Sequence, residues 1–112
     1  MKIMLSHPMS GIPEDEVMDL RRITSLMLIG KFGADTEIID NYHHDDAPEN
    51  AGRLWHLGRS IQQMGEVDAV YFCGDYSNSK ALGCLVEHII CRLYKIKILN
   101  DELGWNKKFG GS

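Results

Sequence analysis

The fold is decided by one stretch of the chain, residues 68–88, which reads DAVYFCGDYSNSKALGCLVEH. The apolar run from Val67 to Cys73 has the length and composition of a buried strand. The residues that follow, Gly74 to Ser79, are mostly turn-forming types. From about Lys80 to Tyr94, apolar residues recur at helical spacing. The stretch therefore predicts a strand, a serine-rich turn and a helix in direct succession.

The same alternation extends outward from this stretch over the rest of the chain. Strands are expected at Lys2 to Ser6, Thr36 to Asp40 and Ile96 to Leu99, and helices from about Pro13 to Lys31 and from about Glu49 to Gly65. Strands that alternate with helices form a mainly parallel sheet with helices on both faces. We therefore expect one α/β domain of three layers, Rossmann-like, with about four or five strands. It should cover residues 1–104, followed by a tail at 105–112.

Each helix should turn one apolar face toward the sheet. The expected faces are Val17, Leu20, Ile23, Thr24, Met27 and Leu28 in the first helix, Leu54, Trp55, Leu57, Gly58, Ile61 and Met64 in the second, and Leu82, Leu85, Val86, Ile89, Ile90 and Leu93 in the third. Gly33 is the expected C-terminal cap of the first helix.

Composition and charge place the chain among soluble globular domains. Its 112 residues allow one core, and 44% hydrophobic with 25% charged residues are ordinary values. The formal net charge of -4 provides no basic field for a nucleic acid polymer. A local site for a single phosphate needs only a few backbone amides and remains open.

The chain shows no apolar run near the roughly 20 residues that span a membrane, and its start does not resemble a signal peptide. We therefore expect a cytoplasmic protein that does not bind membranes. Cys73, Cys84 and Cys91 are odd in number and lie in apolar segments, which is typical of reduced core thiols.

Three polar and glycine-rich loops should meet at one edge of the sheet. They are residues 6–13, 41–48 and 74–83, and each follows a strand. Parallel α/β sheets bind ligands beyond the carboxyl ends of their strands. This edge is therefore the expected binding site.

Glu87 is the candidate catalytic residue. It stands among Leu85, Val86 and Ile89, where a carboxylate is costly unless it faces a cleft or has partners. Such a carboxylate can act as a nucleophile or as an acid or base. In the turn before it, Ser77 or Ser79 could cap the helix and leave amides for an anion, while Gly83 would allow close approach.

Two segments carry a family resemblance: IMLSHPMSGIP at residues 3–13 and SKALGCLVEH at residues 79–88. They resemble the signatures of the nucleoside 2-deoxyribosyltransferase-like superfamily, and in particular its small DUF4406 branch. The resemblance covers about residues 2–99. It implies a flavodoxin-like fold and cleavage of the N-glycosidic bond of a nucleoside or nucleotide, as a hydrolase or a deoxyribosyltransferase.

The resemblance also implies residue roles. Glu87 would attack the anomeric carbon of the sugar as the base departs, through an oxocarbenium-like transition state. The remaining implied substrate-binding residues are Ser6, His7, Pro8, Met9 and Gly11 over the sugar and base, Ser77, Ser79 and Gly83 at the 5′ end or its phosphate, and Asp75.

The chain departs from the family pattern at three places. Met4 stands where active relatives carry a tyrosine that orients the nucleophile, and His7 stands where the branch usually has glycine. An aspartate on the helix before the third strand has no counterpart, and the nearest residues are Ser60 and Gln62. A catalytically silent nucleotide-binding or protein-interaction module is therefore the alternative function.

Other chemistry receives less support from the residues. Two clusters carry metal-ligand types, the loop His43, His44, Asp45 and Asp46 and the helical face Cys84, His88 and Cys91, but a solvated loop and a core face explain them better. Tyr42 or His43 could instead contact the base. Neither GxGxxG nor a P-loop occurs, so no cofactor is expected.

The donor that protonates the leaving base could be Asp75, His7 or His43. The expected partners are a small nucleoside or nucleotide and a second copy of the chain, because members of the resembled family commonly complete their sites across subunits. Trp55 and Leu57 are the candidate dimer face of this homodimer or higher homo-oligomer.

Overall fold

The computed structural model describes residues 1–7, 12–42, 46–73 and 82–100. Along the chain these residues form β1 (Lys2–Ser6), α1 (Glu14–Phe32), β2 (Glu37–Ile38), α2 (Arg53–Met64), β3 (Ala69–Phe72), α3 (Leu82–Leu93) and β4 (Lys97–Ile98). The four strands form one parallel sheet in the order β2-β1-β3-β4. The predicted α/β class and its parallel sheet are confirmed.

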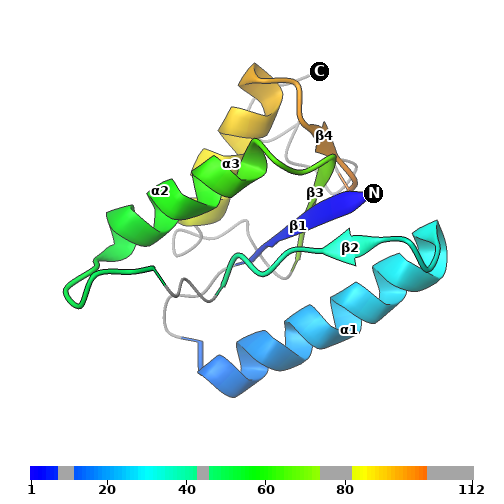
Figure 1. The fold of residues 1–112 in the computed structure, drawn as a ribbon, viewed down its shortest axis with the longest axis horizontal. Helices are drawn as coiled ribbons and strands as arrows, with labels where there is room; N and C mark the ends of the chain where they lie inside the picture. The colour runs from blue at the N-terminus through cyan, green and yellow to red at the C-terminus, as the bar shows by residue number, and fades with distance from the viewer. Residues whose placement is uncertain (8–11, 43–45, 74–81, 101–112) are drawn as a thin grey trace.

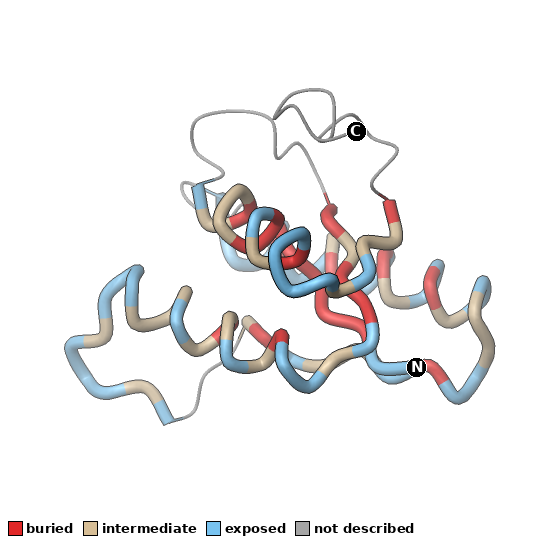
Figure 2. Tube along the Cα trace, turned by 90° about the horizontal axis from the view of Figure 1, so that it is seen from above, coloured by how far each residue is buried: buried red, intermediate tan, exposed pale blue. Residues whose placement is uncertain are grey.

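The sheet lies between two layers of helices, with α1 on one face and α2 and α3 on the other (Figure 1). Side chains of β1 alternate between these faces. Ile3 and Leu5 pack with Leu28 of α1, whereas Met4 packs with Met64 of α2 and Cys84 of α3. In Figure 2 the buried residues gather on the central strands and on the inner sides of the helices.

The strand order places a switch point beside β1. β1 pairs with β2 on one side and with β3 on the other, and the partner of Ser6 at the end of β1 is Phe72 at the end of β3. α1, the helix that follows β1 in the chain, and α3, the helix that follows β3, lie on opposite faces of the sheet (Figure 1). A doubly wound sheet opens a crevice at this point, beyond the carboxyl ends of its strands.

One backbone contact and one side-chain contact fix the ends of elements. Gly33 ends α1 with a φ of 111°, a conformation that favours glycine, and its N–H donates to the carbonyl of Ile29 at 2.8 Å. The predicted cap is confirmed. Asn100 is buried beside β3, where its Oδ1 accepts from the Phe72 N–H at 3.0 Å and its Nδ2 donates to the Phe72 carbonyl. Its amide thereby occupies the place of a strand neighbour.

The predicted inner faces of the helices are partly wrong. In α1 the buried residues are Val17, Arg21, Thr24 and Leu28, while Ile23 is 60% exposed and Met27 is also exposed. In α2, Leu54 and Gly58 point outward, and in α3, Leu82, Ile89 and Leu93 do so. The buried face of α3 is instead Cys84, Glu87, His88 and Cys91.

These corrections share a physical reason. A helix on a sheet buries one narrow face, and in each helix the apolar residues cover a wider arc than that face. Polar contacts then determine which part of the arc is buried. In α1, Arg21 bonds to His7, just after β1, and to the carbonyl of Ile39, just after β2.

Within the described ranges, no helix is long and apolar enough to cross a membrane. The boundary expected between residues 104 and 105 lies outside the described residues.

Candidate functional site

A small cleft opens at the carboxyl end of β1. Its volume is about 30 Å³, and it is lined by Leu5, Ser6, His7, Asn41, Ser60 and Glu87. These residues come from β1 and the residue after it, the segment after β2, α2 and α3. The cleft therefore lies at the predicted edge of the sheet, and it collects three of the sequence-predicted site residues, Ser6, His7 and Glu87.

Glu87 is held inside this cleft by Ser6. Glu87 is only 7% exposed, and its Oε1 accepts a hydrogen bond of 2.8 Å from Ser6 Oγ. Its other oxygen, Oε2, is buried and has no hydrogen-bond partner among the described residues. Burial raises the pKa of Glu87 to about 7, while the bond from Ser6 acts in the opposite direction. The site thus holds a carboxyl group that changes its charge near neutral pH.

His7 is buried on the opposite flank of β1's end, against α1. Arg21 Nη1 lies 2.9 Å from His7 Nε2, and Arg21 Nη2 donates to the carbonyl of Ile39 at 3.2 Å. The ring of Tyr42 lies 6.1 Å from the His7 ring, centroid to centroid. His7 is therefore fixed from α1 and from the segment after β2.

Asn41 supplies a second acceptor to the cleft. Its Nδ2 donates to the carbonyl of Leu5 at 2.8 Å, which ties the segment after β2 to β1. Its Oδ1 is buried and, within the described part of the chain, has no hydrogen-bond partner. A ligand group with N–H or O–H donors would satisfy both this oxygen and Glu87 Oε2.

The residues at which the chain departs from the resembled family's pattern have different surroundings in the structure. Met4 is fully buried in the core between the sheet, α2 and α3, and Ser6 is the side chain that contacts the carboxylate. On α2, Ser60 lines the cleft, whereas Gln62 is exposed and accepts a bond from Arg59 at 3.4 Å. Ser60 is therefore the α2 residue that reaches the site.

Gly83 lies in the first turn of α3, and a Cβ added to it would be 3.9 Å from Leu57 Cδ1, an ordinary contact. The described residues therefore leave room for a side chain there. Pro8, Met9, Gly11, Asp75, Ser77 and Ser79 lie outside the described residues.

The two metal-ligand clusters of the sequence differ in their surroundings. Cys84, His88 and Cys91 all lie on the buried face of α3, and the His88 ring lies tilted against that of Phe72, at 5.2 Å between ring centroids. In residues 1–7, 12–42, 46–73 and 82–100, no group of three His, Cys, Asp or Glu side chains could hold a metal. His43, His44 and Asp45 lie outside these ranges.

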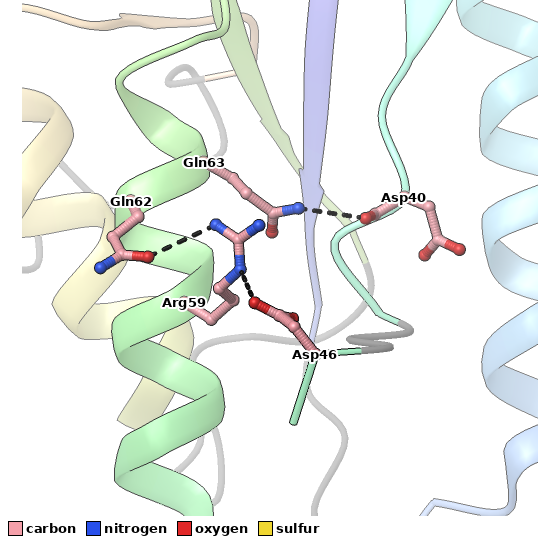
Figure 3. A network of polar contacts seen from close by, with 5 residues as sticks. All are labelled: Asp40, Asp46, Arg59, Gln62 and Gln63. Atoms are coloured by element: carbon pink, nitrogen blue, oxygen red, sulfur yellow. Dashed lines mark hydrogen bonds and ion pairs between the residues drawn. The ribbon is translucent and has the colours of Figure 1, made fainter. Parts of the chain in front are cut away.

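Asp46, the last member of the loop cluster, is engaged with α2 (Figure 3). Its carboxylate accepts from Arg59 Nε at 3.1 Å, and Gln63 Nε2 donates to the carbonyl of Asp40 at 3.3 Å. These contacts join α2 to the segment that carries Asn41.

Two site residues were not predicted from the sequence, Arg21 and Asn41. Arg21 could have been found from the sequence, because it recurs with Val17, Thr24 and Leu28 at helical spacing. A cation on such a mainly buried helix face indicates that it has a buried partner. Asn41 had no such signal beyond its place in a polar loop.

Fold and site together define a class: a doubly wound parallel α/β domain with a buried carboxyl group in its switch-point crevice. Comparisons of the chain with protein-family models, with curated proteins and with solved structures find no match.

Proposed function

We propose that this protein cleaves the N-glycosidic bond of a nucleoside or nucleoside 5′-monophosphate, with Glu87 as the nucleophile. The observation that carries the proposal is the bond from Ser6 to Glu87 in a cleft at the carboxyl end of β1. The second carboxylate oxygen of Glu87 has no hydrogen-bond partner among the described residues, which leaves its lone pairs for attack on a substrate. The resemblance of residues 3–13 and 79–88 supports the same chemistry.

The reaction has two steps. In the first, a Glu87 oxygen bonds to the anomeric carbon, the bond from that carbon to the base nitrogen breaks, and the electron pair leaves with the base, which takes up a proton. In the second, water or an acceptor base attacks the anomeric carbon, loses a proton and releases the Glu87 carboxylate. Water gives hydrolysis, and a base gives transfer.

The size of the cleft limits what it binds. At about 30 Å³ the cleft is far smaller than the roughly 300–1,000 Å³ of a pocket that encloses a small-molecule ligand. We therefore assign only the reacting part of the sugar to it. Pro8, Met9, Gly11, Asp75, Ser77, Ser79 and Gly83 remain the residues proposed to bind the base and the 5′ end.

The decisive experiment is a chromatographic assay of base release from a panel of nucleosides, deoxynucleosides and their 5′-monophosphates, with and without an acceptor base. The test variant is Glu87→Gln, and the control is Glu66→Gln, because Glu66 is exposed. We expect release by the unmodified protein and by the control, and loss in Glu87→Gln. Release that persists in Glu87→Gln contradicts the proposed nucleophile.

A silent nucleotide-binding module is the second candidate, and the burial of Met4 in the core favours it, because no tyrosine orients the carboxylate from that position. It requires a nucleotide-induced rise in melting temperature without base release.

We also propose a homo-oligomer in the cytoplasm. Exposed apolar side chains on α3 support self-association, and three buried free thiols support a reducing compartment.

A further inference from the structure

A buried arginine lies behind the candidate site. Arg21 is only 7% exposed, although it sits in the middle of α1 with the exposed Arg22 beside it. Burying a guanidinium is costly unless its donors find acceptors. Among the described residues, the guanidinium bonds to the Ile39 carbonyl and to Nε2 of His7, a residue that lines the cleft.

The contact between Arg21 and His7 determines where the His7 proton resides. A guanidinium carries only donors, so Arg21 Nη1 must donate and His7 Nε2 must accept, at 2.9 Å. The ring proton is then on Nδ1. If both ring nitrogens carried protons, the positively charged ring would direct an N–H at the Arg21 guanidinium, and the two cations would repel each other at this distance.

Within the described part of the chain, charged and titratable groups reach the pair from the segment after β2, from the end of β3 and from α3. From the segment after β2, Asp40 and Tyr42 act on Arg21, and Asp40 raises its pKa against the lowering effect of burial. From the end of β3, Cys73 is a neutral thiol, because burial raises its pKa to about 12. From α3, Glu87 lines the same cleft and would favour a protonated ring when ionised, but its carboxylate bonds to Ser6.

We propose that Arg21 is a positioning residue that holds His7 as a neutral Nδ1–H donor to the group bound in the cleft. The proposal rests on the proposed function for the identity of that group, a sugar hydroxyl or the departing base. It assigns His7 a hydrogen bond rather than a proton transfer, since a neutral imidazole that gives up Nδ1–H would become an anion. Of Asp75, His7 and His43, the proton donor to the base is therefore not His7.

The first test needs no substrate. Two-bond proton-nitrogen NMR spectra of the ¹⁵N-labelled protein identify the tautomer of each of its five histidines, with the His7 signals assigned from His7→Gln. We expect His7 to carry one proton, on Nδ1, from about pH 5.5 to about pH 8, a range in which an ordinary histidine titrates. A proton on Nε2, alone or together with Nδ1, at pH 7 overturns the proposal.

A matched pair of variants tests the part played by Arg21. Arg21→Met removes the donor and keeps an apolar chain of similar length, and Arg22→Met makes the same change at the exposed neighbour. We expect His7 to titrate in Arg21→Met and to keep its tautomer in Arg22→Met. An unchanged His7 in folded Arg21→Met contradicts the role of Arg21.

Kinetics test whether the Nδ1–H donor is used. An asparagine at position 7 places its amide N–H near the site of Nδ1, and a glutamine places it near that of Nε2. We expect His7→Asn to keep most of kcat/KM and His7→Gln to lose about 10- to 100-fold. Equal losses overturn the donor role. Absence of base release in the unmodified protein would refute the proposed function instead, and the NMR result would still decide the tautomer.

Discussion

Ser6 and Glu87 stand 81 residues apart in the chain and are joined by a buried hydrogen bond of 2.8 Å between Oγ and Oε1. Ser6 is the last residue of the central strand β1, and it pairs with Phe72, the last residue of β3. α3, which carries Glu87, is the next element after β3 in the chain. The bond therefore ties a carboxyl group on a helix to the buried carboxyl end of the central strand. It also favours the ionised form of that group, against the effect of burial.

Replacing Ser6 by alanine should shift the pH dependence of base release. The variant loses the bond that lowers the Glu87 pKa, so the pKa should rise further above about 7. Because the nucleophile must be ionised, kcat/KM rises with pH through this value, and we expect that limb to move up by about 1 pH unit. Profiles of kcat/KM against pH provide the measurement, with Ser25→Ala on α1 as the control. Activity that falls with pH through 7 would mean that Glu87 works protonated.

The order and type of the elements could be predicted because the signals are local. Continuous apolar runs separated by glycine and polar turns mark the strands, and Gly33 marks the end of α1 with a backbone conformation that favours glycine. Strand lengths were less accessible. The run Thr36 to Asp40 contributes only Glu37–Ile38 to the sheet, because only these two residues pair with β1, and the pairing depends on the fold.

A site residue could be predicted from the sequence where its polarity conflicts with that of its neighbours in the chain. It could not be predicted where its role depends on a contact with a residue distant in the chain. Glu87 is a carboxylate within an apolar helix, a conflict visible from its neighbours alone. Asn41 is one polar residue in a polar loop, and only the fold shows that its amide reaches Leu5. Which arc of α1 faces the sheet likewise depends on contacts of Arg21 with residues distant in the chain.

Asn100→Ala should destabilise the fold at the β3 edge. The substitution leaves the N–H and the carbonyl of Phe72 buried without the amide that pairs them, and we expect the free energy of unfolding to fall by about 2 kcal/mol. Urea unfolding measures this change. Asn50→Ala removes an exposed asparagine and should change stability little. Equal effects of the two substitutions would contradict the role of Asn100.

The three cysteines should not react in the folded protein. Cys73, Cys84 and Cys91 are buried, and burial raises the pKa of each thiol to about 12, so almost no thiolate is present at neutral pH. Labelling with iodoacetamide at pH 7.5, followed by mass spectrometry, should show no adduct until denaturant is added. Rapid labelling of a native cysteine would show that its segment opens.

Substitution on the outer face of α3 should weaken self-association. Leu93 is 71% exposed, and Ile89 and Tyr94 are exposed near it in the chain, which is an unfavourable surface for a monomer. If this face mediates the proposed homo-oligomer, Leu93→Asp lowers the sedimentation coefficient at micromolar concentration. Lys95→Asp, at an exposed charged residue, is the comparison. An unmodified protein that sediments as a monomer would refute the assembly.

Glu87→Gln should make the protein more stable, and the gain should depend on pH in a defined direction. The unfolded chain ionises Glu87 at its ordinary pKa of 4.5, whereas the folded chain does so at about 7. Between these values the folded state keeps a proton that the unfolded state has released, so the free energy of unfolding falls as pH rises through the window. The difference in pKa corresponds to about 3 kcal/mol above pH 7, and glutamine, which does not titrate, avoids this loss.

Urea unfolding of the unmodified protein, of Glu87→Gln and of the exposed control Glu66→Gln at pH 4.5 and pH 8 measures this difference in the free energy of unfolding. The advantage of Glu87→Gln should grow by that amount between the two pH values. An advantage independent of pH would mean that the Glu87 carboxyl is solvated and that the cleft does not hold it.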